Sequence, residues 1–153
     1  MLDPASRKFT SICSSDLKVG DIVMCHNGDT FSADFALLTS SNEGEAFIKT
    51  SSLDGEKNLK KRVQCKDTEE IFKPKTLHPE EYLKIRGELT LELPNKDLHS
   101  FKGTLNINQT SFTLSEKQLL LKGASLANTD WVVALCCYTG EETKIMLNSQ
   151  PGR

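Results

Sequence analysis

The sequence predicts one mainly β domain, and three features indicate it. Short apolar stretches are separated by clusters of Gly, Asn, Asp and Ser, a pattern typical of strands joined by turns. Residues 87–93 (GELTLEL) alternate between apolar and polar positions, as a half-buried strand does. Residues 131–138 are apolar on both faces, which predicts a buried central strand. A chain of 153 residues has room for one such domain.

Four strands are expected before the alternating segment, at residues 21–25, 35–39, 46–50 and 59–65. Alternation in the third of them places Phe47 on one face and Ile48 on the other. A brief helix is expected over 79–85, with proline in its first turn and two glutamates near its positive end. The composition around it is poor in core residues, so we expect an exposed insertion at about 66–86.

Strands at 104–107 and 118–122 and a short helix from about Gly140 complete the expected elements. The domain is expected to span residues 17–148. Residues 1–16 and 149–153 are expected to be flanking segments. From the residues alone, a sandwich, a jelly roll or a barrel with little helix fits this order of elements.

Composition and charge exclude several classes of function. Lys and Arg total 19 and Asp and Glu total 21, so the net charge of −2 gives no overall field that would recruit nucleic acid or an anionic membrane. The longest apolar run, 131–137, is far shorter than the roughly 20 residues that span a bilayer. The five cysteines are odd in number and irregularly spaced, so we expect reduced, packed thiols and no metal site.

One segment has the pattern of a chemical site. In residues 50–60 (TSSLDGEKNLK), an Asp-Gly turn joins two expected strands, because glycine accepts a positive φ without steric cost. The turn would direct Glu56 outward from a stiff β scaffold, and such a carboxylate suits a general base or a group that positions water. An ordinary solvated hairpin turn has the same sequence features, so turn chemistry alone leaves both interpretations open.

The surrounding residues add a resemblance to a known family. Blocks that are similar to the actuator domain of P-type ATPases, several of them typical of its phospholipid-flippase branch, occur in the family's order: LKVGDIV at 17–23, FSAD at 31–34, LDGEKNLK at 53–60, ELPN at 92–95 with FKGTL at 101–105, and LLLKG, LANT and YTGEETK within 119–144. Ser32 stands where the family usually has proline. Together the blocks cover roughly residues 17–148.

The resemblance implies a fold and a catalytic part. The fold would be a distorted jelly roll, or double-stranded β-helix, with a few short helices. In the family, the Asp-Gly-Glu loop swings over an aspartyl phosphate in a separate phosphorylation domain, and its glutamate positions and activates the attacking water. Carried over to this chain, Glu56 would be that residue and Gly55 would allow close backbone approach. Asp54 would shape the loop, to which Asn58 also belongs.

Lys57 departs from the family pattern, which usually has threonine there. Its amino group has three alternatives: pairing with Glu56, reaching the phosphate as a point charge, or pointing to solvent. With Lys60, Lys61 and Arg62 it forms a basic cluster in the sequence. The cluster is a candidate for docking against the phosphorylation domain or against anionic head groups, and a solvated strand edge is the equal alternative.

The resemblance also implies partners beyond this chain. The longer protein would use ATP and Mg²⁺ and would move phospholipid toward the cytosolic leaflet, with its phosphorylation domain and membrane helices in the same chain and an accessory membrane subunit. The domain itself would be cytosolic and would bind no cofactor. The sequence has no DKTGT phosphorylation motif, so we expect the isolated chain to be inactive. The alternatives are an actuator of an ion-pumping branch and a stand-alone β-sandwich binding module.

Overall fold

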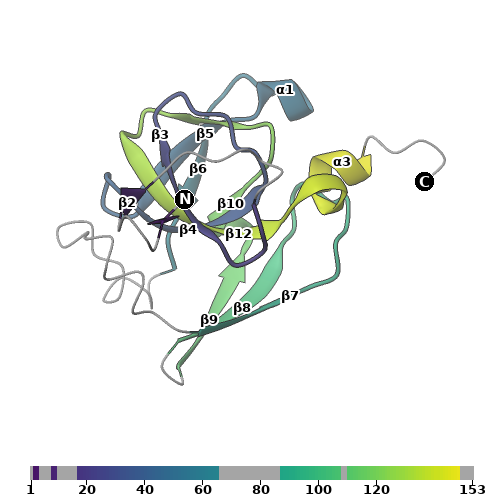
Figure 1. Ribbon diagram of the computed structural model, residues 1–153. Coiled ribbons are helices and arrows are strands. Elements are labelled where there is room, and N and C mark those ends of the chain that lie inside the picture. The colour runs from purple at the N-terminus through teal and green to yellow at the C-terminus, as the bar shows by residue number, and fades with distance from the viewer. Residues whose placement is uncertain (1, 4–7, 10–16, 66–86, 108–109, 149–153) are drawn as a thin grey trace.

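The computed structural model describes residues 2–3, 8–9, 17–65, 87–107 and 110–148 (Figure 1). The expected insertion at 66–86, and the helix expected within it, lie outside the described residues. The same holds for the C-terminal flank 149–153 and for most of the N-terminal flank 1–16.

The described residues form mostly strands, so the predicted mainly β class with a few short helices is confirmed. The strands are β1 (Leu2–Asp3), β2 (Lys8–Phe9), β3 (Ile22–His26), β4 (Asp34–Ser40), β5 (Glu45–Lys49), β6 (Lys60–Val63), β7 (Gly87–Leu91), β8 (Lys102–Ile107), β9 (Thr110–Ser115), β10 (Leu119–Leu120), β11 (Ser125–Ala127) and β12 (Trp131–Tyr138). The helices are α1 (Ser51–Asp54), η4 (Glu116–Gln118), η5 (Gly140–Glu142) and α3 (Lys144–Asn148).

The central sheet has the strand order β10-β4-β12-β3, and its pairs are antiparallel. Seven of the eight residues of β12 are buried, and Trp131 at its start is half-buried, so the predicted central strand is confirmed. All seven residues of β4 are buried as well. These two strands pair along most of their length, and their side chains form the middle of the hydrophobic core.

Two three-stranded antiparallel sheets complete the core. One has the order β11-β5-β6 and the other the order β7-β8-β9. In Figure 1, the β7-β8-β9 sheet extends to the bottom of the view, while α1 lies at the top. Phe112 and Leu114 of β9 are buried in the same hydrophobic cluster as β4 and β12. Their sheet therefore packs as part of one core.

Several sequence predictions need correction. The alternating strand ends at Leu91, and Leu93 is 86% exposed, because the chain leaves the sheet after Glu92, whose N–H donates to the carbonyl of Lys102. The strand expected at 118–122 is reduced to the two residues of β10, preceded by the helical turn η4. The helix expected from Gly140 is divided into η5 and α3. The strand expected at 59–65 is shorter, since β6 covers Lys60–Val63. Strands β1, β2, β9 and β11 were not predicted.

A buried carboxylate joins the C-terminal part of the chain to the central sheet. Asp34 is completely buried at the start of β4. Its Oδ1 accepts a hydrogen bond from the backbone N–H of Lys122 at 2.9 Å, and its Oδ2 accepts one from the backbone N–H of Lys144 at 2.7 Å. The carboxylate thus fixes the turn after β10 and the first residue of α3 to one strand.

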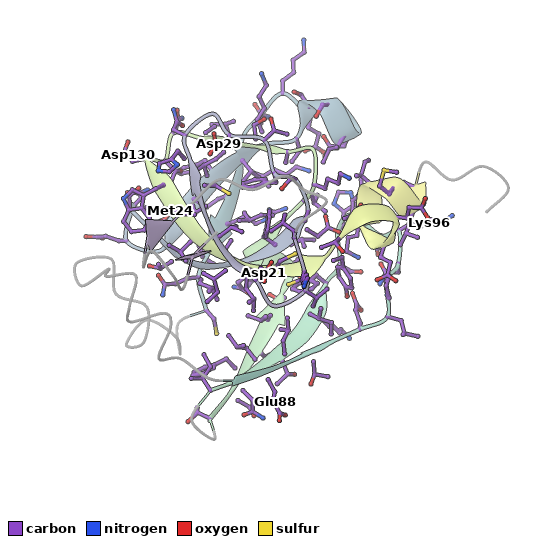
Figure 2. The ribbon with its side chains drawn as sticks, in the orientation of Figure 1. Asp21, Met24, Asp29, Glu88, Lys96 and Asp130 are labelled. Atoms are coloured by element: carbon purple, nitrogen blue, oxygen red, sulfur yellow. The ribbon has the colours of Figure 1, made fainter. Side chains whose placement is uncertain are left out.

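The side chain of Lys144 is buried too, with 1% exposed. Its Nζ donates a hydrogen bond to Asn95 Oδ1 at 2.7 Å and lies 4.0 Å from Glu92 Oε1. Tyr138 Oη donates to the carbonyl of Glu92 at 2.7 Å. Lys96, labelled beside α3 in Figure 2, accepts a hydrogen bond from Asn148 Nδ2 through its carbonyl at 2.6 Å. The segment after β7 is therefore fastened to α3.

Candidate functional site

The candidate loop begins with one helical turn where the sequence predicted a strand through Thr50. Strand β5 ends at Lys49, and α1 follows as a single turn. The N–H groups of Leu53 and Asp54 donate to the carbonyl of Thr50 at 2.8 and 3.1 Å. Gly55 closes the turn with φ of 76°, in the left-handed region that glycine adopts without strain. The predicted use of glycine for a positive φ is confirmed.

The carboxylate of Asp54 binds three partners and holds the loop together. Its Oδ1 accepts hydrogen bonds from Thr50 Oγ1 at 3.1 Å and from the backbone N–H of Glu56 at 3.0 Å. Its Oδ2 accepts one from Lys60 Nζ at 2.5 Å. The side chain is only 17% exposed. These contacts support the expectation that Asp54 shapes the loop.

The side chain of Glu56 projects from this frame and is 59% exposed. Its Oε2 pairs with Lys60 Nζ at 3.3 Å. Lys57 and Asn58 are exposed beside it. Of the three alternatives for Lys57, pairing with Glu56 is not the arrangement found, since the ion pair of Glu56 is made with Lys60. An exposed carboxylate on a fixed backbone can accept a proton from water or orient it.

The charges of Asp54 and Lys60 reinforce each other. The hydrogen bond from Lys60 lowers the pKa of Asp54 below its ordinary value, and the N–H of Glu56 and the hydroxyl of Thr50 act in the same direction. The hydrogen bond to Asp54 raises the pKa of Lys60, with a further contribution from Glu56. Both groups are therefore ionised at neutral pH, and their charges attract each other within the loop.

A glycine turn just before β11, the strand that pairs with β5, supports α1. Ser52 Oγ donates a hydrogen bond to the carbonyl of Gly123 at 3.1 Å. Leu53 packs against the same turn, where a Cβ on Gly123 would lie 2.9 Å from Leu53 Cδ2. Sequence reasoning missed this support. Both segments belong to blocks that resemble the family, LDGEKNLK and LLLKG, but nothing in the sequence indicates that these two blocks lie in contact.

The predicted basic cluster is divided between two faces of β6. Lys60 points to the loop, whereas Lys61 is 57% exposed and pairs with Glu45 at 2.8 Å. Arg62 is half-buried, and its Nε donates to the carbonyl of Leu119 at 2.6 Å. Burial lowers the pKa of Arg62. The cluster therefore does not present its charges on one surface, and docking by these residues stays a prediction.

The cysteines that the structure describes are free thiols. Cys136 and Cys137 are buried in β12, as the sequence predicted for packed cysteines. Within the described ranges, no group of three or more His, Cys, Asp or Glu side chains could hold a metal ion. The same ranges contain no helix that is long and apolar enough to cross a membrane.

The fold and the loop define a class: a small mainly β domain that holds one exposed glutamate beside an Asp-Gly turn. Comparison with known proteins identifies the family. The family model described as "P-type ATPase actuator domain" matches residues 4–147. The chain therefore belongs to the P-type ATPase actuator-domain family, and the resemblance noted in the sequence is confirmed.

Similar curated proteins carry phospholipid-transport names. Phospholipid-transporting ATPase DRS2 of Saccharomyces cerevisiae is 37% identical over 135 residues, which are 88% of this chain and 10% of that protein. Phospholipid-transporting ATPase tat-1 of Caenorhabditis elegans is 39% identical over 136 residues, or 88% of this chain and 12% of that protein. Human phospholipid-transporting ATPase ID is 39% identical over 132 residues, or 86% and 10%. The chain thus spans about a tenth of the length of these relatives.

Proposed function

We propose that Glu56 activates the water that hydrolyses the aspartyl phosphate of a P-type ATPase containing this domain. One observation carries the proposal: the two carboxylates of the loop differ in their surroundings. Asp54 is 17% exposed and binds three groups of its own loop, whereas Glu56 is 59% exposed and pairs, among the described residues, with one charged group, that of Lys60. Glu56 is therefore the carboxylate that is available to a water outside the domain.

The proposed step is in-line displacement at phosphorus. The water oxygen forms a bond to phosphorus while the bond from phosphorus to the aspartyl oxygen breaks, which releases phosphate and an aspartate carboxylate. Glu56 accepts a proton from the water as it attacks. Gly55 lacks a side chain, and a Cβ there would meet no other atom within 4 Å, so the backbone is open on this side. An oriented water gains most of its reactivity from position.

For the longer protein, the proposal includes ATP-dependent transport of phospholipid, with ATP and Mg²⁺ bound by domains outside this chain. The domain would lie on the cytosolic side of a membrane. Its partners would be the phosphorylation domain and membrane helices of the same chain, and an accessory membrane subunit. The names of the similar proteins favour phospholipid over ions as the transported substrate.

The test uses the full-length ATPase in membranes, with Glu56→Gln and the matched control Glu45→Gln. Glu45 is also an ion-paired glutamate, with 41% of its side chain exposed, but it lies at the start of β5, away from the loop. The acid-stable phosphoenzyme is formed with ATP, and its decay is followed after a chase with unlabelled ATP, with and without candidate lipids. We expect Glu56→Gln to form phosphoenzyme and to slow its decay by about a hundredfold or more, as loss of a general base does.

Glu45→Gln should decay at the wild-type rate. If Glu56→Gln also decays at that rate, Glu56 is an ordinary turn residue and the proposed function is wrong. Stimulation of wild-type decay by phospholipid supports the transported substrate, whereas stimulation by an inorganic ion alone would indicate an ion-pumping branch.

A further inference from the structure

The amino group of Lys60 lies between the two carboxylates of the loop. Its Nζ is 2.5 Å from Asp54 Oδ2 and 3.3 Å from Glu56 Oε2, and its side chain is 20% exposed. Lys60 is the first residue of β6, and its backbone pairs with Ile48 of β5. Ile48 is completely buried in the core. The cation is therefore carried by a strand that pairs with a core residue of β5.

This placement solves an electrostatic problem of the loop. Asp54 and Glu56 carry like charges two residues apart, and a phosphate approaching them would bring more negative charge. A cation between the carboxylates offsets both repulsions. The pair engages Oε2 of Glu56, and a carboxylate has acceptor sites on both oxygens. Lys60 thus restricts where the Glu56 carboxylate lies without using all of its capacity to accept a proton.

We propose that Lys60 is a positioning residue, which holds the Glu56 carboxylate at a fixed distance from Asp54 so that it meets the attacking water in one orientation. This inference rests on the proposed function of Glu56. It gives Lys60 a role different from docking. A docking lysine would direct its charge outward, as Lys61 does with 57% of its side chain exposed.

The experiment follows phosphoenzyme decay in the full-length ATPase in membranes for Lys60→Met, Lys60→Arg, Glu56→Gln and the double variant Glu56→Gln/Lys60→Met. Lys61→Met is the matched control, since it removes a lysine from the next position of the same strand. The amount of phosphoenzyme formed from ATP checks that each variant folds.

We expect Lys60→Met to slow phosphoenzyme decay roughly tenfold. This value lies between the small effect of removing an exposed ion pair and the loss of about a hundredfold in rate when a catalytic group is misplaced. Lys60→Arg should restore most of the rate, because its guanidinium can bind both carboxylates. Lys60→Met should add nothing in the Glu56→Gln background, because it acts through Glu56. Lys61→Met should slow decay much less than Lys60→Met, because the charged partner that the structure gives Lys61 is Glu45.

Three outcomes would overturn the inference. In the first, Lys60→Met decays at the wild-type rate while Glu56→Gln is slow; Lys60 is then only a strand residue, and the proposed function of Glu56 stands. In the second, the effects of Glu56→Gln and Lys60→Met multiply in the double variant, which makes them independent. In the third, Lys61→Met slows decay as much as Lys60→Met, which indicates docking by the whole strand. A wild-type rate for Glu56→Gln is different, since it removes the proposed function itself.

Discussion

Replacing Gly123 with alanine should loosen the candidate loop from a distance. Gly123 has φ of +93°, and a Cβ there would lie 2.9 Å from Leu53 Cδ2 in α1. Two costs follow. An alanine in the left-handed region costs about 1–2 kcal/mol, and moving Leu53 off its preferred rotamer costs about 0.5–1.5 kcal/mol. Lower entropy of the unfolded chain returns about 0.4–1 kcal/mol. We therefore expect the free energy of unfolding to fall by about 2 kcal/mol.

Gly28 provides a matched control. Its φ is +90°, but a Cβ there would meet nothing within 4 Å. Gly28→Ala should thus lose about 1 kcal/mol through the backbone alone. Urea unfolding of the 153-residue chain gives both free energies, and the difference between the variants measures the contact with α1.

The same pair separates stability from function. In the full-length ATPase, Gly123→Ala should slow phosphoenzyme decay, because the new methyl group displaces Leu53 and with it α1, which begins the loop of Glu56. Gly28→Ala should leave decay unchanged. Equal unfolding free energies together with equal decay rates for the two variants would refute the reasoning. The contact between α1 and the Gly123 turn would then have no part in holding Glu56.

Two further predictions concern the buried groups. Lys144→Met should lower the free energy of unfolding by about 2 kcal/mol at neutral pH, because it leaves Asn95 Oδ1 and the half-buried carboxylate of Glu92 without their cation. Burial lowers the pKa of Lys144, so the unfolded chain binds this proton more tightly than the folded chain does. The free energy of unfolding of the wild type should therefore rise with pH up to about 10.4, the pKa of an unfolded lysine. Urea titrations at several pH values should show that Lys144→Met lacks this rise. Burial also raises the pKa of Cys136 to about 12, so a thiol reagent at pH 8 should label it only as the chain unfolds, which peptide mapping by mass spectrometry can check. Rapid labelling in the absence of urea would contradict the buried position.

The sequence predicted those elements whose signal lies in neighbouring residues. Strand β12 was predicted because its residues are apolar on both faces, and the Asp-Gly turn because glycine accepts a positive φ. Strand β9 could have been predicted as well: Phe112 and Leu114 alternate with polar residues, and both are buried. Its serines and threonines made it resemble a loop.

Other features could not be read locally. The single turn α1 is too short to show a helical period in the sequence. It forms because the carbonyl of Thr50 accepts its hydrogen bonds and Gly55 ends it in the left-handed conformation. The burial of Lys144 depends on Glu92 and Asn95, about 50 residues away in the sequence. In the site, Glu56 was predicted as a candidate from the sequence. That Lys60 points toward the loop could not be predicted, because it depends on the register between β5 and β6.

The pairing of β3 with β12 has a mechanical consequence. The N–H of Gly20 donates to the carbonyl of Cys136, and the N–H of Cys136 donates to the carbonyl of Asp21, both at 2.8 Å. The segment that leads into β3 and the segment that leaves β12 are thus neighbours at one end of an antiparallel pair. A force that pulls both segments in the same direction moves the sheet as one body. A force that separates the two segments breaks the hydrogen bonds between the strands one at a time, beginning with those of Cys136.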